Sequence, residues 1–467
     1  MRRLGFVAAL VLPFAASCAF LLDFDSLKGD PADAGTEAAT GGSAGQAGSG
    51  GQAGSDAAVP DCTTPADCDD QDAFTSDDCQ AGVCKHAPQG ALVDDGFAID
   101  QPTPDLQRVT LGTIGSHFVV STYAASLQNH DLKVSSFSST ATDNQFEVTR
   151  DMVYFLAGLP DAGVAEETPG SVAGIAENDG ALQTYFVTYK AFTWTKIWHA
   201  ALDETLSMTG APKIVGDKYD VLDVKGYPKP TPMGSDMAAT WASSGMVFIA
   251  SEKKPYGTFD VGADRVAPLS AGGSPAFLNL KKNENNYYWQ VGTTSQGQPD
   301  CSPQQPTWDT VSSTTPVPGL TIVAFSSSYL GAHAAETHFA FCTSSGCLID
   351  PDCSNSATPF GRNPSVYAVG TSAVVPGGGR LRLATAASVQ NGQDTQLVLG
   401  MAYADLRDQG ESSFGSYPEV TVATQKGAPA GTADYPAVTI LGDKVALAWI
   451  DGESPSQVLH VRRYRLE

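Results

Sequence analysis

Short runs of β-branched and aromatic residues recur from about residue 91 to residue 467, and they restrict what this region can fold into. Examples are 117–123, 182–189 and 444–450, and clusters of Gly, Pro, Asn and Asp separate such runs. This pattern predicts β-strands joined by turns. Since no amphipathic stretch is longer than two helical turns, we expect region 91–467 to be all-β.

The strand pattern repeats with a variable period. The last unit, 436–464, reads as a strand, a tight Gly442-Asp443 turn, a strand that ends in Trp449-Ile-Asp451, a loop and a third strand. Similar openings lie at 170–172, 275–277 and 364–366, with weaker ones near Asp105, Ser235 and Gly319. Spacings of about 40 to 70 residues suit four-stranded blades. The region resembles the β-propellers of exported bacterial proteins, which implies about seven blades (six to eight); a pair of large sandwiches is the alternative.

The N-terminus has the pattern of an export signal. Arg2 and Arg3 precede fourteen uncharged residues, 4–17, a stretch too short to span a bilayer as a helix. The small residues 15–17 in front of Cys18 resemble the lipobox of bacterial lipoproteins. This resemblance implies cleavage before Cys18 and attachment of lipid to it. An ordinary signal peptide cut near the same place is the alternative.

Four segments are predicted along the chain. Residues 1–18 are the signal and anchor, and 19–60 are a flexible tether rich in Gly, Ala and Ser, which cannot bury a core. Residues 61–90 are rich in Cys and Asp and resemble short modules behind Gly-rich tethers in lipoproteins of large-genome Gram-negative bacteria. The resemblance implies no activity. The β-propeller-like region, 91–467, follows.

Nine cysteines give an odd count, which a lipid on Cys18 explains without a free thiol. The remaining eight fall into two local groups, each able to form two disulfides in three connectivities. Disulfides indicate an oxidising compartment. The eight candidates are Cys62, Cys68, Cys79, Cys84, Cys301, Cys342, Cys347 and Cys353.

The net charge of −24 excludes two classes of partner. A nucleic-acid-binding protein needs a basic surface to neutralise phosphates, and the sequence has none. The same charge opposes adsorption to anionic lipid headgroups. We therefore expect contact with the bilayer only through the acylated N-terminus.

No catalytic constellation is predicted. In His333-Ala-Ala-Glu336-Thr-His338 the spacing departs from both metalloprotease patterns, and residues five apart in a strand point to opposite faces. The Gly-x-Ser-x-Gly match at 41–45 lies in the tether. The stretch 236–241 resembles the second half of an Asp box, the structural hairpin motif of sialidase-type propellers, but a pair of catalytic acids is not visible in the sequence.

Six carboxylates crowd the Cys/Asp-rich segment: Asp67, Asp69, Asp70, Asp72, Asp77 and Asp78. Calcium takes six to eight oxygen ligands, so a structural calcium clip is one interpretation. The spacing fails the EF-hand template, and a solvated acidic loop pinned by disulfides is the favoured alternative. We therefore predict no cofactor and leave any metal ligand unassigned.

Together these patterns predict a monomeric, exported lipoprotein of the cell envelope, in the outer membrane or on the cell surface. The main interpretation is a binding or adhesion protein that displays its propeller to a protein or glycan ligand without catalysis. The alternative is a secreted carbohydrate-active hydrolase or lyase on the same scaffold. The sequence favours the first without settling whether the chain is an enzyme.

Overall fold

A computed structural model describes the chain in segments. The described residues are 62–70, 72–126, 130–152, 168–190, 193–217, 224–233, 236–243, 246–253, 255–260, 266–271, 274–283, 286–291, 294–295, 307–309, 321–328, 335–343, 346–349, 364–366, 372–374, 380–391, 394–405, 413–425 and 436–467. The predicted anchor Cys18 and the tether lie outside them.

The described residues are almost entirely strand and contain one short helical turn, the 3-10 turn Pro65–Cys68. The prediction of an all-β chain is therefore confirmed. No helix among these residues has the length and apolar character that a membrane crossing requires.

The strands form a small hairpin and a series of larger sheets, named here A to G. The hairpin consists of β1 (Thr75–Gln80) and β2 (Val83–Pro88). Sheet A contains β4 (Leu106–Ile114), β5 (His117–Ala125), β6 (His130–Ser138) and β7 (Val148–Asp151). Sheet B contains β8 (Thr168–Pro169), β9 (Gly174–Asn178), β10 (Ala181–Lys190), β11 (Thr193–Leu202) and β12 (Lys213–Asp217). Sheet C contains β13 (Val224–Met233), β14 (Asp236–Ser243), β15 (Met246–Ala250) and β16 (Pro255–Asp260).

The second half of the chain continues in the same manner. Sheet D contains β17 (Val266–Ala271), β18 (Ser274–Asn283), β19 (Asn286–Val291) and β20 (Thr294–Ser295). Sheet E contains β21 (Thr307–Asp309), β22 (Thr321–Ser328), β23 (Ala335–Thr343) and β24 (Gly346–Ile349). Sheet F contains β25 (Pro364–Val366), β26 (Ser372–Val374), β27 (Arg380–Asn391), β28 (Asp394–Asp405), β29 (Ser413–Ser416) and β30 (Val420–Gln425). Sheet G contains β3 (Leu92–Pro102), β31 (Ala437–Leu441), β32 (Lys444–Asp451) and β33 (Val458–Leu466).

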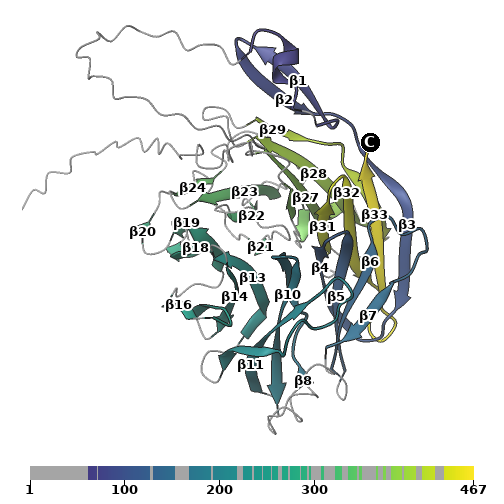
Figure 1. Cartoon of the computed structure of the whole chain (residues 1–467), viewed down its shortest axis with the longest axis vertical. Coiled ribbons are helices and arrows are strands. Elements are labelled where there is room, and N and C mark those ends of the chain that lie inside the picture. Colours follow the sequence, from purple (N-terminus) through teal and green to yellow (C-terminus); the bar gives the residue numbers. More distant parts are fainter. Residues whose placement is uncertain are drawn as a thin grey trace, which may run out of the picture.

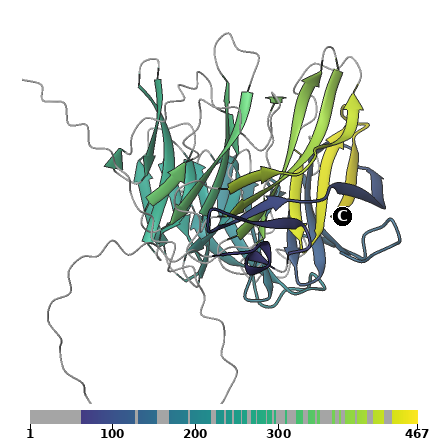
Figure 2. The ribbon, with the colours of Figure 1, turned by 90° about the horizontal axis from the view of Figure 1, so that it is seen from above.

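The larger sheets are antiparallel and fan out around a common centre, toward which β4, β13, β21 and β31 lie (Figure 1). Seen from above, many of the strands in the teal, green and yellow sheets stand upright beside one another (Figure 2). This is a propeller-like arrangement, because a sandwich would instead place two sheets face to face. The predicted propeller class is confirmed to this extent.

Sheet G pairs β3, which precedes sheets A to F in the chain, with strands that follow them. Strand β3 pairs with β33 from Leu92↔Leu466 to Pro102↔Val458. The remaining strands match the unit predicted for 436–464, since Gly442, with φ of 63°, and Asp443 form the turn between β31 and β32. The participation of β3 was not predicted.

Apolar side chains fill the space between neighbouring sheets. Between sheets A and B, Ile114 and Val119 belong to the same buried cluster as Phe186 and Trp198. Between sheets G and A, the rings of Phe97 and Phe137 stack with centroids 4.6 Å apart. The apolar side chains of one sheet therefore pack against the sheets on both of its sides.

The Arg463 guanidinium forms an ion pair within sheet G and links this sheet to sheet A. Arg463 of β33 bonds through Nε to the Asp95 carboxylate of β3, and both side chains are nearly fully buried. The same guanidinium donates to the carbonyls of Ser138, at 3.0 Å, and Ala141, at 2.8 Å, and lies 4.7 Å from the Phe97 ring centre.

Replacing Asp95 by Ala should lower the free energy of unfolding by about 3–5 kcal/mol, because it leaves a buried guanidinium without its counter-charge. Denaturant unfolding followed by circular dichroism measures this. The matched control is Asp443→Ala at the exposed β31–β32 turn, with an expected change within about 0.5 kcal/mol. Equal losses in the two variants would contradict the prediction.

Candidate functional site

Three connections of sheets A and B lie at one end of the strands, and two of them carry acidic side chains. They are the β4–β5 turn, the β9–β10 turn and the loop from β11 to β12. In an antiparallel sheet, the connection from first to second strand and that from third to fourth lie at the same end. The local fold therefore brings together turns that are distant in sequence.

Gly115 lies between two carboxyl groups at this end. Its N–H donates to Glu177 Oε2 at 3.2 Å, and Glu177 comes from the end of β9. A Cβ on Gly115 would lie 2.0 Å from Oε1 of Glu204, which belongs to the loop after β11. Because Gly115 also has φ of 51°, the position favours glycine for its backbone conformation and for space. The two carboxyl groups thus approach the same turn.

The two acids have different surroundings. Glu177 is half-buried and Glu204 is exposed. Burial raises the pKa of Glu177, the Gly115 N–H opposes this, and the negative charge of Glu204 raises the pKa further; the net direction is upward. Burial and a like charge both disfavour ionisation of a carboxyl. Glu177 therefore keeps its proton to a higher pH than an ordinary glutamate.

A third acid holds the loop that carries Glu204. Asp203 Oδ1 accepts from the Thr205 hydroxyl at 2.7 Å and from the N–H groups of Thr205 and Ser207 at 2.9 Å. These bonds, led by that of the Thr205 side chain, lower the pKa of Asp203. Asp203 is therefore an ionised structural group that fixes the loop.

This arrangement suits general acid–base chemistry. A carboxyl with a raised pKa beside a second carboxyl can provide a proton donor and a base in one place. Acid pairs of this kind cleave glycosidic bonds. The sequence analysis named neither residue, because both are acids at polar turns in a strongly acidic chain, and only the meeting of three connections distinguishes them.

A second polar cluster lies between sheets B and C. His199 Nε2 bonds to Gln183 Oε1 at 2.7 Å, and its Nδ1 lies 3.3 Å from Glu252, which in turn pairs with Lys213 at 2.9 Å. Burial lowers the pKa of His199, although the Glu252 charge opposes this. The groups bond chiefly to one another, so we interpret the cluster as a link between the sheets.

The Asp-box-like stretch contributes to the same junction. Asp236 Oδ2 accepts from the Ser251 hydroxyl at 2.6 Å, and Oδ1 lies 3.2 Å from Lys253 Nζ. Asp236 thereby connects the β13–β14 turn to the segment after β15. Its contacts are structural.

The cysteine candidates separate into described and undescribed groups. Disulfides join Cys62 to Cys79 and Cys68 to Cys84, which settles the connectivity that the sequence left open in the first group. In the second group, the β23–β24 register places Cys342 opposite Cys347. The remaining candidates, Cys18, Cys301 and Cys353, lie outside the described residues.

The histidine candidates form no metalloprotease site among the described residues. Glu336 and His338 lie two residues apart in β23, and His333 lies outside the described segments. Part of the zinc-protease-like pattern therefore lies in a strand, whereas such a site requires a helix.

Comparisons with known proteins give similarities of fold at low identity. No family model matches the chain, and no curated protein does. Among solved structures, a Trypanosoma rangeli sialidase is 11% identical with a TM-score of 0.40, over 82% of this chain and 56% of that protein. A Hadza microbial sialidase is 12% identical with a TM-score of 0.41, over 77% and 66%. A phage phi92 endosialidase is 8% identical with a TM-score of 0.38, over 81% and 69%.

This finding contradicts the main functional prediction, because the similar structures are named as sialidases and an endosialidase, whereas we expected a binding protein without catalysis. We withdraw that prediction. The chain spans about half the length of the Trypanosoma protein, and at these TM-scores no residue role or substrate is transferred to this chain.

Replacing Glu204 by Gln should lower the pKa of Glu177, because it removes the negative charge that disfavours ionisation of Glu177. The measurement is the pH titration of the Glu177 side-chain carboxyl carbon by NMR. Glu453→Gln, in the loop between β32 and β33, is the control and should leave that titration unchanged. A Glu177 titration that did not move in the Glu204 variant would contradict the proximity of the two groups.

Proposed function

We propose that this protein is an exported carbohydrate-active hydrolase that uses Glu177 as general acid and Glu204 as the paired carboxylate. One observation carries the proposal: the Gly115 turn adjoins both carboxyl groups, and the pKa of one of them is raised. A carboxyl whose pKa is shifted by burial and by a specific charge is a candidate catalytic group.

The chemistry requires the two acids in different protonation states. Glu177, protonated, gives its proton to the glycosidic oxygen as the bond to the anomeric carbon breaks. The Glu204 carboxylate stabilises positive charge on the sugar. It acts either as a base that activates water or as a nucleophile at the anomeric carbon. A water molecule supplies the hydroxyl of the new reducing end and the proton that restores Glu177.

The negative charge of the protein limits the substrates that it can bind. The chain carries a net charge of −24, and Asp203 adds an ionised carboxylate to the loop of Glu204. A polyanionic glycan would meet repulsion at such a surface. We therefore propose a neutral polysaccharide as substrate.

We further propose that the scaffold has seven blades, sheets A to G. The support is the succession of contacts between neighbouring sheets: β31 with β4, β4 with β9, β9 with β13, β13 with β17, β17 with β22, β23 with β25, and β26 with β31. Each sheet then meets the next one in the series A to G, and sheet G meets sheet A.

We also propose that the protein is anchored through lipid on Cys18, with the 19–60 tether between the membrane and the folded region. The signal-like residues 1–17 and the odd cysteine count support this. A durable anchor needs more than one acyl chain.

The hydrolysis test uses the mature full-length protein on a panel of neutral and anionic polysaccharides, with release of reducing ends as readout. Glu177→Gln and Glu204→Gln should each lower kcat by about 10²–10⁴-fold, because each removes a proton-transfer or charge-stabilising group. Wild-type activity should fall as pH rises through the raised pKa of Glu177, since the acid must be protonated. Glu453→Gln should retain full activity. Absence of turnover on every polysaccharide, or turnover that both substitutions leave intact, would refute the proposal.

The anchor test is metabolic labelling of expressing cells with palmitate. Wild-type protein should incorporate label and Cys18→Ser should not, because the thiol is the acylated atom. Cys301→Ser is the control for loss of a different cysteine. A Cys18→Ser protein that kept its label would disprove the anchor.

A further inference from the structure

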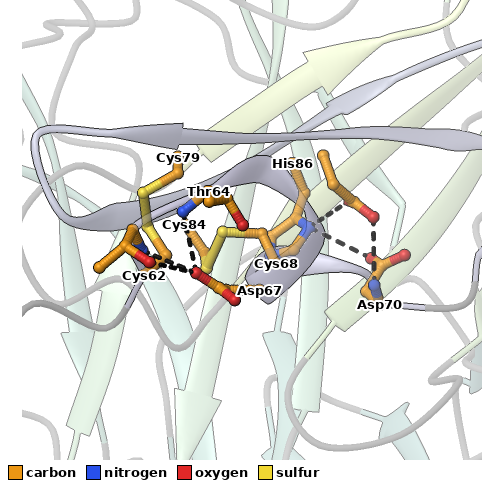
Figure 3. The surroundings of a disulfide bond; sticks show 10 residues. Cys62, Thr64, Asp67, Cys68, Asp70, Cys79, Cys84 and His86 are labelled. Carbon is orange, nitrogen blue, oxygen red and sulfur yellow. Dashed lines mark hydrogen bonds and ion pairs between the residues drawn. A yellow bond between two sulfur atoms is a disulfide. The ribbon is translucent and has the colours of Figure 1, made fainter.

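The Cys/Asp-rich segment contains a buried histidine beside two carboxylates. His86 of β2 lies directly opposite Asp77 of β1 in the hairpin register, and Asp70 comes from the segment that follows the 3-10 turn. The disulfides Cys62–Cys79 and Cys68–Cys84 fasten that segment to the hairpin. Figure 3 shows His86 and Asp70 next to these disulfides.

Three potential ligand atoms converge in this cluster. His86 Nδ1 lies 2.7 Å from Asp77 Oδ1 and 3.4 Å from Asp70 Oδ2. These atoms all lie within 4.8 Å of one another. The side chains are 2% exposed for His86, 0% for Asp70 and 16% for Asp77, so the cluster is largely buried and water reaches it on the side of Asp77.

Hydrogen bonds to the opposite oxygens hold both carboxylates in this orientation. Asp77 Oδ2 accepts from the Asp70 N–H at 3.1 Å. Asp70 Oδ1 accepts from the Asp72 N–H at 2.8 Å and from the Thr75 hydroxyl at 2.9 Å. Outer hydrogen bonds of this kind orient the ligands of protein metal sites. Each carboxylate therefore turns its other oxygen toward the imidazole.

We propose that Asp70, Asp77 and His86 bind a divalent first-row transition metal ion, with Zn²⁺ as the representative. One hydrogen on Nδ1 can bond to one carboxylate oxygen at a time, whereas a cation on the nitrogen lone pair contacts all three atoms. The cation also offsets two negative charges that are expensive to bury. Water completes a four-coordinate shell.

The spacing suits an ion of this size. Zinc binds nitrogen and oxygen at about 2.0–2.1 Å, so two ligands of a tetrahedral ion lie about 3.3 Å apart. The separation of Asp70 Oδ2 from His86 Nδ1, at 3.4 Å, already matches this, and the Asp77 oxygen needs to move outward by about 0.6 Å.

The calcium clip considered from the sequence fits less well. Calcium requires six to eight oxygen ligands, and here a nitrogen occupies the centre. Other acids of the segment have different tasks: Asp67 accepts from the N–H groups of Thr63 and Thr64, and Asp72 pairs with Arg382. The nearby cysteines are disulfide-bonded and supply no thiolate.

The test titrates Zn²⁺ into metal-free full-length protein, with Co²⁺ as a spectroscopic probe. We expect one equivalent to bind saturably, with visible Co²⁺ absorption bands shaped by a nitrogen ligand and a higher Tm in Zn²⁺. His86→Asn and Asp77→Asn should each weaken binding by at least about tenfold, because each removes a ligand. Asp78→Asn, an exposed acid of the same strand, should bind like wild type.

A count of zero free thiols among Cys62, Cys68, Cys79 and Cys84 verifies that each variant retains the fold of the segment. Wild-type protein that binds no equivalent of Zn²⁺ overturns the proposal without reference to any variant. Binding that survives in both His86→Asn and Asp77→Asn overturns it as well, because the ion would then lie elsewhere. Neither outcome depends on hydrolase activity.

Discussion

The pairing of β3 with β33 is the constraint on which the rest of the structure depends. Sheet G has three strands from the C-terminal end of the chain, and the fourth comes from residues 92–102. Without β3, the edge of β33 would present unpaired N–H and C=O groups, and Asp95 would not reach Arg463. The same strand places Phe97 against Phe137 of sheet A, so that one pairing supports both the edge of sheet G and the core beside it.

This pairing also fixes the disulfide-bonded segment against the sheets. Ala91 and Glu467 exchange backbone hydrogen bonds of 2.8 and 3.0 Å just before the start of β3. On the far side of the segment, the Phe74 carbonyl accepts from the Tyr417 hydroxyl at 3.1 Å, and the Arg382 guanidinium lies 5.0 Å from the Phe74 ring centre. In Figure 1, β1 and β2 accordingly lie at the margin of the fan, beside β29. The segment is therefore docked on sheets F and G.

The alternation of residues along the sequence predicted the fold class, and it predicted the starts of some sheets better than those of others. Predicted starts at Asp105, 170–172, 364–366 and 436 lie at the beginnings of sheets A, B, F and G. In sheets C, D and E the predicted start falls at the second strand, β14, β18 or β22, because first and second strands share the same alternation. The role of β3 was missed since pairing between chain ends leaves no local signal.

The candidate site could not be predicted from the sequence, for a related reason. Glu177 and Glu204 each occupy a position where a solvated acid is ordinary, and their relation arises only when the turns of two sheets meet at Gly115. The His86 cluster was missed for the same reason. The acids near it are visible in the sequence, but the sequence does not show which of them caps the 3-10 turn, which pairs with an arginine and which face Nδ1 of His86.

The closure of sheet G has a consequence for the order of events during folding. Strand β3 leaves the ribosome early, yet its partners in β33 follow after most of the chain, as the 363-residue separation of Arg462 and Ile99 shows. Contacts between such distant residues form slowly, because a long loop must close first. Sheets A to F can therefore assemble before β3 finds its partner, and the pairing of β3 with β33 completes sheet G.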